Sequence, residues 1–411
     1  MKEKAQAPEL RFDGFTDDWE ERKFFESIAS TIDFRGRTPK KLGMDWSDSG
    51  YLALSALNVK NGYIDPLADA HYGDEKLYRK WMSGRELKKG QVLFTTEAPM
   101  GNVAQVPDDN GYILSQRTVA FETKEDMMTN DFLAVLLKSP LVFNNLSALS
   151  SGGTAKGVSQ KSLKGLSITV PLDIDEQQKI GAFFKQLDDT IALHQRKLDL
   201  LKEQKKGYLQ KMFPKNGAKV PELRFAGFAD DWEERKLKDI AQFNPKTVLP
   251  DEFEYVDLES VVGTEMISHR TESKDQAPSR AQRLAQKGDV FYQTVRPYQM
   301  NNYLYDLPYD NYVFSTGYAQ MRPNIDSYFL LNSVQNKQFV QHVLDRSTGT
   351  SYPAINSSDL SNIEIHVPSK LSEQQKIGAF FQSIDDTIAL HQLKLDLLKE
   401  QKKGFLQKMF A

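Results

Sequence analysis

The side chains of this chain that could do chemistry are basic, amide and hydroxyl groups that gather in a few loops. The densest cluster is QTVRPYQMNN at 293–302, which carries amides, an arginine and an aromatic ring in one loop. Arginine, glutamine and asparagine can form paired hydrogen bonds with base edges in the major groove of DNA, whereas lysine, serine and threonine more often contact phosphates. Any one of these residues alone is better interpreted as a solvated surface side chain. The prediction of nucleic-acid recognition therefore depends on the clusters.

The candidate DNA-contacting residues form two sets, one in each half of the chain, in loops beside predicted strand ends. The first set is Arg35, Arg37, Thr95, Thr96, Glu97, Gln116, Arg117, Thr154, Lys156, Gln160 and Lys161. The second set is Tyr292, Gln293, Arg296, Tyr298, Gln299, Asn301, Thr316, Tyr318, Ser351, Tyr352 and Asn356.

The sequence contains no convincing catalytic constellation. GGTAKG at 152–157 resembles a phosphate-binding loop only in composition, and Gly-rich dinucleotide turns and methyl-donor tetrapeptides are not found. Asp251, Glu272 and Lys274 have the residue types of a nuclease metal site, but such fragments arise by chance in a charged chain. Six histidines and no cysteine leave few acid–base groups and no thiolate ligands. We predict no catalytic site, no metal site and no cofactor of this chain's own.

Length, charge and hydropathy narrow the class of protein. A chain of 411 residues has room for two to three domains, and its net charge of -3 means that contact with nucleic acid must come from local basic clusters. No apolar stretch reaches the roughly 18 residues of a membrane span, and the N-terminus has no apolar core of a signal peptide. We expect no membrane partner, and the lack of cysteine fits a cytoplasmic protein.

Two segments occur twice, and they define the architecture. Residues 176–213 and 373–410 are identical at 33 of 38 positions, and the leaders PELRFDGFTDDWEERKF at 8–24 and PELRFAGFADDWEERKL at 221–237 agree at 14 of 17. The segments between them, 25–172 and 238–369, are nearly unrelated. A constant frame around two divergent inserts indicates one scaffold that presents two different readers.

The long repeat carries a heptad pattern, with apolar residues alternately four and three positions apart. The predicted packing seam consists of Ile180, Phe184, Leu187, Ile191, Leu198 and Leu201 in the first copy, and of Ile377, Phe381, Ile384, Ile388, Leu395 and Leu398 in the second. Because a domain separates the copies, an antiparallel pair is the natural arrangement. His194 and His391 interrupt the seam; we interpret them as register-setting residues, since two histidines fall short of a metal ligand set.

The two inserts follow the same predicted order of elements. In the first, strands are predicted at Tyr51–Leu57, Gln91–Thr96, Asn102–Val106 and Thr118–Glu122, with a helix near 130–146. In the second, strands are predicted at Phe253–Leu258, Asp289–Thr294, Asn301–Tyr305 and Tyr318–Arg322, with a helix near 327–344. The predicted fold class is α/β (α+β): two mixed domains joined by two long antiparallel coiled-coil helices with pseudo-two-fold symmetry.

These features resemble the specificity subunit of a type I restriction–modification system over the whole chain. The resemblance rests on the two helices that begin EQQKI, the strand ending in proline before each, the repeated leaders and the two variable domains in tandem. It implies target-recognition domains that each read half of a split DNA target, two methyltransferase subunits bound to the assembly, and added restriction subunits. S-adenosylmethionine, ATP and Mg would then be bound by those partners. The resemblance assigns no base contacts, because recognition domains vary.

The predicted boundaries follow from the repeats: a recognition domain at 1–172, a spacer helix at 173–213, a linker and second recognition domain at 214–369, and a second helix at 370–411. A helix of 38 residues is about 57 Å long, which suits half-sites one DNA turn or slightly more apart. Two alternatives stay open at this point: a coiled-coil adaptor that binds only proteins, and a stand-alone DNA-modifying enzyme.

Overall fold

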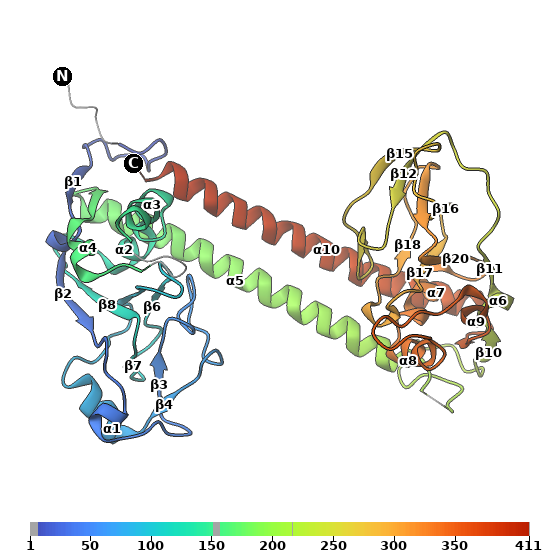
Figure 1. Ribbon diagram of the computed structural model, residues 1–411, viewed down its shortest axis with the longest axis horizontal. Helices are drawn as coiled ribbons and strands as arrows, with labels where there is room; N and C mark the ends of the chain where they lie inside the picture. Colours follow the sequence, from blue (N-terminus) through green and yellow to red (C-terminus); the bar gives the residue numbers. More distant parts are fainter. Residues whose placement is uncertain (1–6, 151–156, 216, 411) are drawn as a thin grey trace. The chain divides into compact units, whose positions relative to one another are not determined.

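The structure, a computed structural model, describes residues 7–150, 157–215 and 217–410 (Figure 1). The chain forms two compact units, Met1–Gln195 with Leu393–Ala411, and Arg196–Gln392. The long helices α5 (Ile174–Lys211) and α10 (Leu371–Lys408) each contribute one half to each unit. Among the described residues no single helix has the length and hydropathy of a membrane span, although the bent pair Asn130–Leu136 and Pro140–Leu149 passes that test jointly.

In the first unit the two long helices lie antiparallel. Phe183 of α5 meets Phe405 of α10 edge to face, with 5.1 Å between ring centroids, and Asp188 of α5 pairs with Lys402 of α10. Lys138 approaches the same carboxylate, with 3.3 Å between its Nζ and an Asp188 oxygen. Burial lowers the pKa of Lys138, because the charged ammonium loses water, and Asp188 partly offsets this effect.

In the second unit the same contacts recur with the helices exchanged. Tyr208 of α5 meets Phe380 of α10 at 5.0 Å between ring centroids, and Lys205 pairs with Asp385 at 2.6 Å. Burial raises the pKa of Asp385, and the attraction of Lys205 opposes that rise. Each unit therefore contains one aromatic pair and one lysine–aspartate pair between antiparallel helices, as the pseudo-two-fold prediction requires.

The repeated leader binds the first turn of each long helix. Arg11 donates two hydrogen bonds to the buried carboxylate of Glu176, at 2.6 and 2.8 Å, and Trp19 donates a third at 3.3 Å. The equivalent donors of the second unit are Arg224 and Trp232, which bind Glu373. A buried carboxylate needs such partners, and both the leader and the EQQ start of the helix occur in each copy of the repeat.

The first unit combines two main sheets and a two-stranded pair with a layer of helices. Its strands are β1 (Glu20–Lys23), β2 (Ile28–Asp33), β3 (Tyr51–Leu54), β4 (Tyr72–Gly73), β5 (Val92–Thr95), β6 (Val103–Gln105), β7 (Ile113–Leu114), β8 (Thr118–Thr123) and β9 (Ser167–Val170). Its short helices are η1 (Phe24–Ser27), η2 (Lys40–Leu42), α1 (Glu75–Met82), α2 (Asn130–Leu136), α3 (Pro140–Leu149) and α4 (Gln160–Gly165). The sheets have the orders β2-β8-β5-β6 and β4-β3-β7, and β1 pairs with β9. Figure 1 shows α2, α3 and α4 near the start of α5, and α1 with β3 and β4 at the opposite end of the unit.

The second unit repeats this plan. Its strands are β10 (Glu233–Lys236), β11 (Ala241–Phe243), β12 (Glu252–Val256), β13 (Val261–Val262), β14 (Glu265–Met266), β15 (Arg270–Ser273), β16 (Ala281–Leu284), β17 (Val290–Gln293), β18 (Tyr303–Leu304), β19 (Tyr312–Ser315), β20 (Tyr318–Pro323) and β21 (Glu364–Val367). Its short helices are α6 (Leu237–Ile240), η3 (Pro297–Gln299), α7 (Ser327–Val334), α8 (Lys337–Asp345) and α9 (Ser357–Ser361). The main sheets have the orders β11-β20-β17-β18 and β15-β12-β19-β16, β10 pairs with β21, and β13 pairs with β14.

The matching strand orders confirm that the inserts are two versions of one fold. In both units the second sheet contains one parallel pair, β3 with β7 and β12 with β19. The versions differ beside that pair, where β16 extends the sheet of the second unit and α1 packs near β7 in the first. The readers thus differ at the edge of the second sheet, while the first sheet and its helices stay the same.

The helices predicted near 130–146 and 327–344 are each two helices, α2 with α3 and α7 with α8. In the first unit Pro140 cannot continue α2, because it has no N–H, and it begins α3 after the N-cap Ser139. In the second unit Asn336 caps α8, and its side chain accepts a hydrogen bond from the Gln338 N–H. The apolar pattern of the sequence continues through the break in each unit, so the pattern alone predicts one helix where the structure has two.

Candidate nucleic-acid interface

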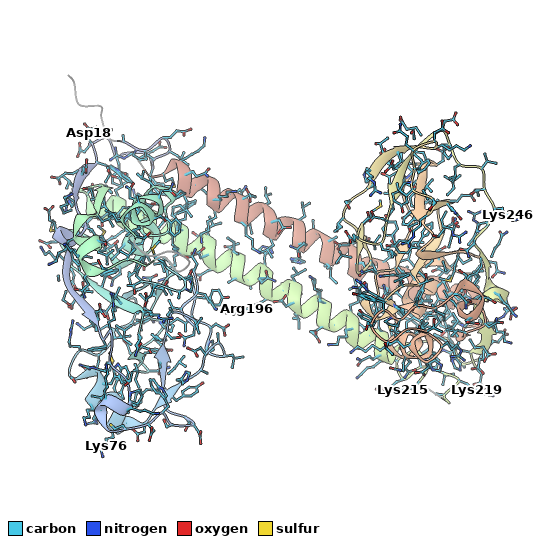
Figure 2. All side chains as sticks on the ribbon, in the orientation of Figure 1. Asp18, Lys76, Arg196, Lys215, Lys219 and Lys246 are labelled. Atoms are coloured by element: carbon cyan, nitrogen blue, oxygen red, sulfur yellow. The ribbon has the colours of Figure 1, made fainter. Side chains whose placement is uncertain are left out.

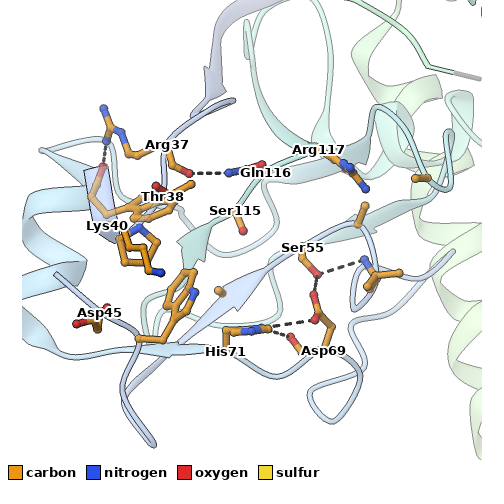
Figure 3. Close-up of a pocket in the computed structure, with 17 residues that line it drawn as sticks. Arg37, Thr38, Lys40, Asp45, Ser55, Asp69, His71, Ser115, Gln116 and Arg117 are labelled. Carbon is orange, nitrogen blue, oxygen red and sulfur yellow. Dashed lines mark hydrogen bonds and ion pairs between the residues drawn. The ribbon is translucent and has the colours of Figure 1, made fainter. Parts of the chain in front are cut away.

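A recess in the first unit brings several predicted residues together. It has a volume of about 430 Å³ and is lined by Arg37, Gln116 and Arg117 from the predicted set. Figure 3 shows these side chains on one side of the recess and Asp69 with His71 on the other. The lining combines cationic, amide and hydroxyl groups with aromatic rings, which is the composition that contacts bases and phosphates.

Contacts within the first unit hold this lining in place. The Arg37 guanidinium donates to the Trp81 carbonyl oxygen and lies over the Phe34 ring, 4.3 Å from its centroid. Gln116 donates its amide N–H to the Arg37 carbonyl oxygen at 3.0 Å. Arg117 is exposed and pairs with Glu97 at 3.1 Å. Arg37 and Gln116 are therefore preorganised, whereas Arg117 keeps a free face toward solvent.

The far side of the recess consists of residues that the sequence did not indicate. Asp69 accepts a hydrogen bond from the Ser55 hydroxyl at 2.9 Å and lies 3.5 Å from His71 Nδ1. The Trp46 ring packs on both His71 and Trp81, with centroids 5.5 and 5.6 Å apart. Pairing of β3 with β4 brings these residues together, and no local sequence pattern signals that long-range contact.

The other residues of the first set lie elsewhere. Thr95 and Thr96 are buried, and their hydroxyls bond the backbone of Asn102 and Arg117, so they support the loops rather than face a ligand. Arg35 and Gln160 both bind the Asp33 carboxylate, at 3.3 and 2.9 Å. Lys161 is exposed beside them. Thr154 and Lys156 lie outside the described residues.

In the second unit the predicted contacts gather on two adjoining loops, one of which carries Arg296 and the other Tyr352. We call residues 294–302 the reader loop. Arg296 lies over the Tyr352 ring, with 4.4 Å between its guanidinium carbon and the ring centroid, and its N–H bonds the Pro353 carbonyl oxygen at 2.8 Å. Tyr298 and Gln299 are exposed at the tip of the same loop. Tyr298, Gln299 and Tyr352 thus face solvent together, and the half-buried Arg296 lies beside them.

Internal hydrogen bonds fix the shape of the reader loop. The Asn301 amide oxygen accepts from the Gly263 N–H at 2.8 Å, and Gln335 donates to the Met300 carbonyl oxygen at 3.0 Å. Gln299 accepts from the Gln293 amide at 2.9 Å, which leaves the Gln299 amino group as a donor. The loop is therefore anchored to the turn between β13 and β14 and to the end of α7.

Burial removes three residues of the second set from the candidate DNA contacts. Tyr292 and Tyr318 are fully buried, and Gln293 is 2% exposed. Burial raises the pKa of both phenols, since an ionised ring would lose its water. β17 and β20 are covered on both faces, so their side chains pack into the cores. The remaining members, Thr316, Ser351 and Asn356, lie near the surface, and Asn356 caps α9.

The predicted seam residues and metal alternatives can also be placed. Within the seam, Ile180, Phe184, Leu198, Leu201, Ile377, Phe381, Ile388 and Leu395 are buried, and Leu187, Ile191, Ile384 and Leu398 are partly buried. His194 and His391 are partly buried. No group of three His, Asp or Glu side chains that could hold a metal ion occurs in the part of the chain that the structure describes. Glu272 of the nuclease-like fragment instead pairs with Arg270 at 2.7 Å.

Comparison of the sequence with known protein families finds a match over most of the chain. The family described as the type I restriction modification DNA specificity domain matches residues 17–203 and 229–400. The chain is 26% identical over 176 residues to the HindI type I restriction enzyme specificity subunit of Haemophilus influenzae, which covers 39% of this chain and 37% of that protein. It is 24% identical over 312 residues to the MjaVIII specificity subunit of Methanocaldococcus jannaschii, which covers 72% of each.

Solved structures share the fold. The S subunit of a type I restriction–modification system from M. genitalium superposes with a TM-score of 0.64 at 15% identity, over 98% of this chain and 99% of that one. A chain from a structure describing complex assembly and conformational transition of the type I R-M system gives a TM-score of 0.53 at 19% identity, over 94% and 96%. At these identities the likeness establishes the architecture, and the function must be argued from the residues.

Proposed function

We propose, from the premise that this chain belongs to the type I restriction–modification DNA specificity family, that it is the DNA-recognition subunit of such a complex and that each unit reads one half of a bipartite target. The observation that carries this proposal is a shared scaffold with different reading surfaces. The first unit offers a recess and the second an exposed loop, on equivalent four-stranded sheets. Two different readers in one chain imply two different half-sites.

The equivalence of the two reading loops can be traced residue by residue. Thr96 follows β5 and its hydroxyl donates to the carbonyl oxygen of Arg117, while Thr294 follows β17 and donates to that of Gly317. Two residues further on, the first unit has Ala98 and the second has Arg296, both with a φ near +50°. The same backbone position therefore carries a methyl group in one unit and a guanidinium in the other, which supports separate specificities.

The long helices supply the constant part of the design. Each is a continuous 38-residue helix shared by both units, and we propose that their length sets the gap between the half-sites. Each of the two helices also carries a pair of exposed leucines, seven residues apart on one helix face. These pairs are Leu193 with Leu200 on α5 and Leu390 with Leu397 on α10, each more than half exposed. Two equivalent apolar patches suit two copies of one partner, and we assign them to methyltransferase docking.

In this proposal the chemistry belongs to the partners. The subunit carries no catalysis of its own, acts in the cytoplasm, and leaves S-adenosylmethionine to the methyltransferase subunits and ATP with Mg to the restriction subunits. Its own contribution is to position the complex on DNA.

The test is selection of duplexes from a random library by the full chain, alone and with its methyltransferase partner. Enrichment of two sequence blocks at a constant separation is expected. A protein-only adaptor would enrich nothing. Cleavage or methyl transfer by the purified chain alone, with Mg, ATP and S-adenosylmethionine, would instead identify an enzyme.

A further inference from the structure

A groove in the second unit is lined by cations without any carboxylate. It lies between α5 and the reader loop, and has a volume of about 370 Å³. Lys202, Lys205 and Lys206 of α5 and Lys337 of α8 contribute its charge, and Gln299 of the reader loop forms part of the opposite wall. In a chain with a net charge of -3, such a lining selects an anionic occupant.

Two of these lysines keep their charge available. Lys205 is 17% exposed and is neutralised by Asp385 at 2.6 Å, and Lys206 pairs with Glu203 at 3.2 Å. Lys202 and Lys337 are exposed, and neither pairs with a carboxylate within the described ranges. The surface of the groove therefore carries at least two ammonium groups whose counterions must come from outside the protein.

The geometry of the groove favours an extended polyanion over a small anion. Its two available ammonium groups come from different elements, because Lys202 lies on α5 and Lys337 at the start of α8. Phosphates of one DNA strand advance about 3.4 Å each along the duplex axis, so a strand that runs along the groove can meet both lysines. Gln299 lines this groove and also stands in the reader loop, which makes the two surfaces continuous.

We propose that this groove holds the sugar–phosphate backbone beside the second half-site, so that α5 binds DNA as well as spacing the recognition domains. The inference rests on the proposed function, and it assigns the DNA backbone as the partner of this groove. Backbone contacts of this kind carry no sequence information, but they fix the position of a reading loop on the duplex. Lys202 and Lys337 are therefore assigned as positioning residues for the reader loop.

The repeat offers a matched control. Lys399 of α10 is the equivalent of Lys202, since the helix repeat has an offset of 197 residues, and it is likewise exposed. The first unit, however, has Pro140 at the first position of α3, where the second unit has Lys337 at the first position of α8. Lys246 provides a control within the second unit, because Figure 2 shows it at the edge of that unit away from α5.

The experiment measures binding of the full chain to its selected duplex and to a scrambled duplex over a range of salt concentrations. The variants are Lys202→Gln, Lys337→Gln and their double substitution, with Lys399→Gln and Lys246→Gln as controls. Each phosphate contact that is lost should lower the slope of log affinity against log salt by about 0.9, and at about 0.1 M salt this corresponds to roughly eightfold weaker binding. The double variant should lose about 1.8 in slope, and lose affinity equally for both duplexes.

Three results would overturn the assignment: an unchanged slope in the double variant, a loss confined to the selected duplex, or an equal loss in Lys399→Gln or Lys246→Gln. Failure of the proposed function would look different, because the unsubstituted chain would then show no preference for the selected duplex over the scrambled one.

Discussion

Replacement of Arg296 by alanine isolates the reader loop of the second unit. Its side chain has no carboxylate partner among the described residues, and its contact with the protein is the Tyr352 ring at 4.4 Å. Losing an exposed cation–π contact should cost about 0.5–1 kcal/mol of folding stability. The backbone bond from Arg296 to Pro353 and the positive φ of 53° are the same for alanine as for arginine, so no further strain is introduced.

The effect on DNA should be larger and confined to one half-site. A paired arginine–guanine contact is worth about 1–3 kcal/mol of discrimination, which corresponds to roughly 5- to 150-fold. Arg296→Lys keeps the charge but loses the planar fork, so it should restore overall affinity more than base preference. Arg117→Ala is the reciprocal variant, because Arg117 is the exposed arginine of the recess in the first unit.

The assay is competition binding of the full chain with duplexes that carry one altered position in either half-site. Arg296→Ala should flatten the preference in the second half-site and leave the first unchanged, and Arg117→Ala should do the reverse. Equal losses in both half-sites with either variant, in proteins whose thermal unfolding is otherwise normal, would refute the separation of the two readers.

Four further predictions concern the frame. Four residues inserted after Leu201 add about 6 Å of helix and rotate its seam, so a variant that folds should select a longer gap with the same bases; an unchanged gap would contradict the spacer role. The fragment 1–213 should form a two-fold homodimer in which the partner's α5 replaces the missing α10, and a fragment that sediments as a monomer at tens of micromolar would count against this. Glu176→Gln should lower the free energy of unfolding, measured in urea, by roughly 2–3 kcal/mol. This is below the roughly 3–5 kcal/mol expected for breaking a fully buried ion pair, because the Arg11 side chain is 14% exposed. The matched Glu373→Gln should behave alike, and a loss under about 0.5 kcal/mol, the scale of an exposed pair, would refute the anchoring role. Leu397→Asp should remove one of the two bound methyltransferase subunits, as counted by native mass spectrometry, and full occupancy would exclude that patch.

The two long helices and their leaders were predictable, because the sequence patterns that indicate them are local and occur twice. The heptads of both long helices place apolar residues on one seam, and near-identity of the copies indicates a pair. The arrangement of two mixed domains of one fold also followed from the order of strands. Short strands were missed, such as β7 with two residues, because they form only through long-range pairing and have too few residues for alternation to be visible.

The candidate site was less predictable because exposure is decided by tertiary packing. Tyr292 lies in β17, where Phe291 and Tyr292 are both fully buried on opposite faces. A strand covered on both sides shows no polar face, so its aromatic residues could not be distinguished from those of a reading loop. The structure places Tyr298 and Gln299 of the reader loop in solvent and Arg296 half-buried beside them, and their role in DNA contact stays a prediction. Lys202 and Lys337 come together only when α8 packs near α5, and no spacing in the sequence indicates that contact.

The most direct measurement is sequencing of methylated positions in the DNA of a host with and without this gene, in the presence of its methyltransferase partner. The account predicts methylation at one motif made of two unlike sequence blocks, separated by a gap of constant length and unspecified bases. A single contiguous motif, or a methylation pattern that does not depend on the gene, would contradict it.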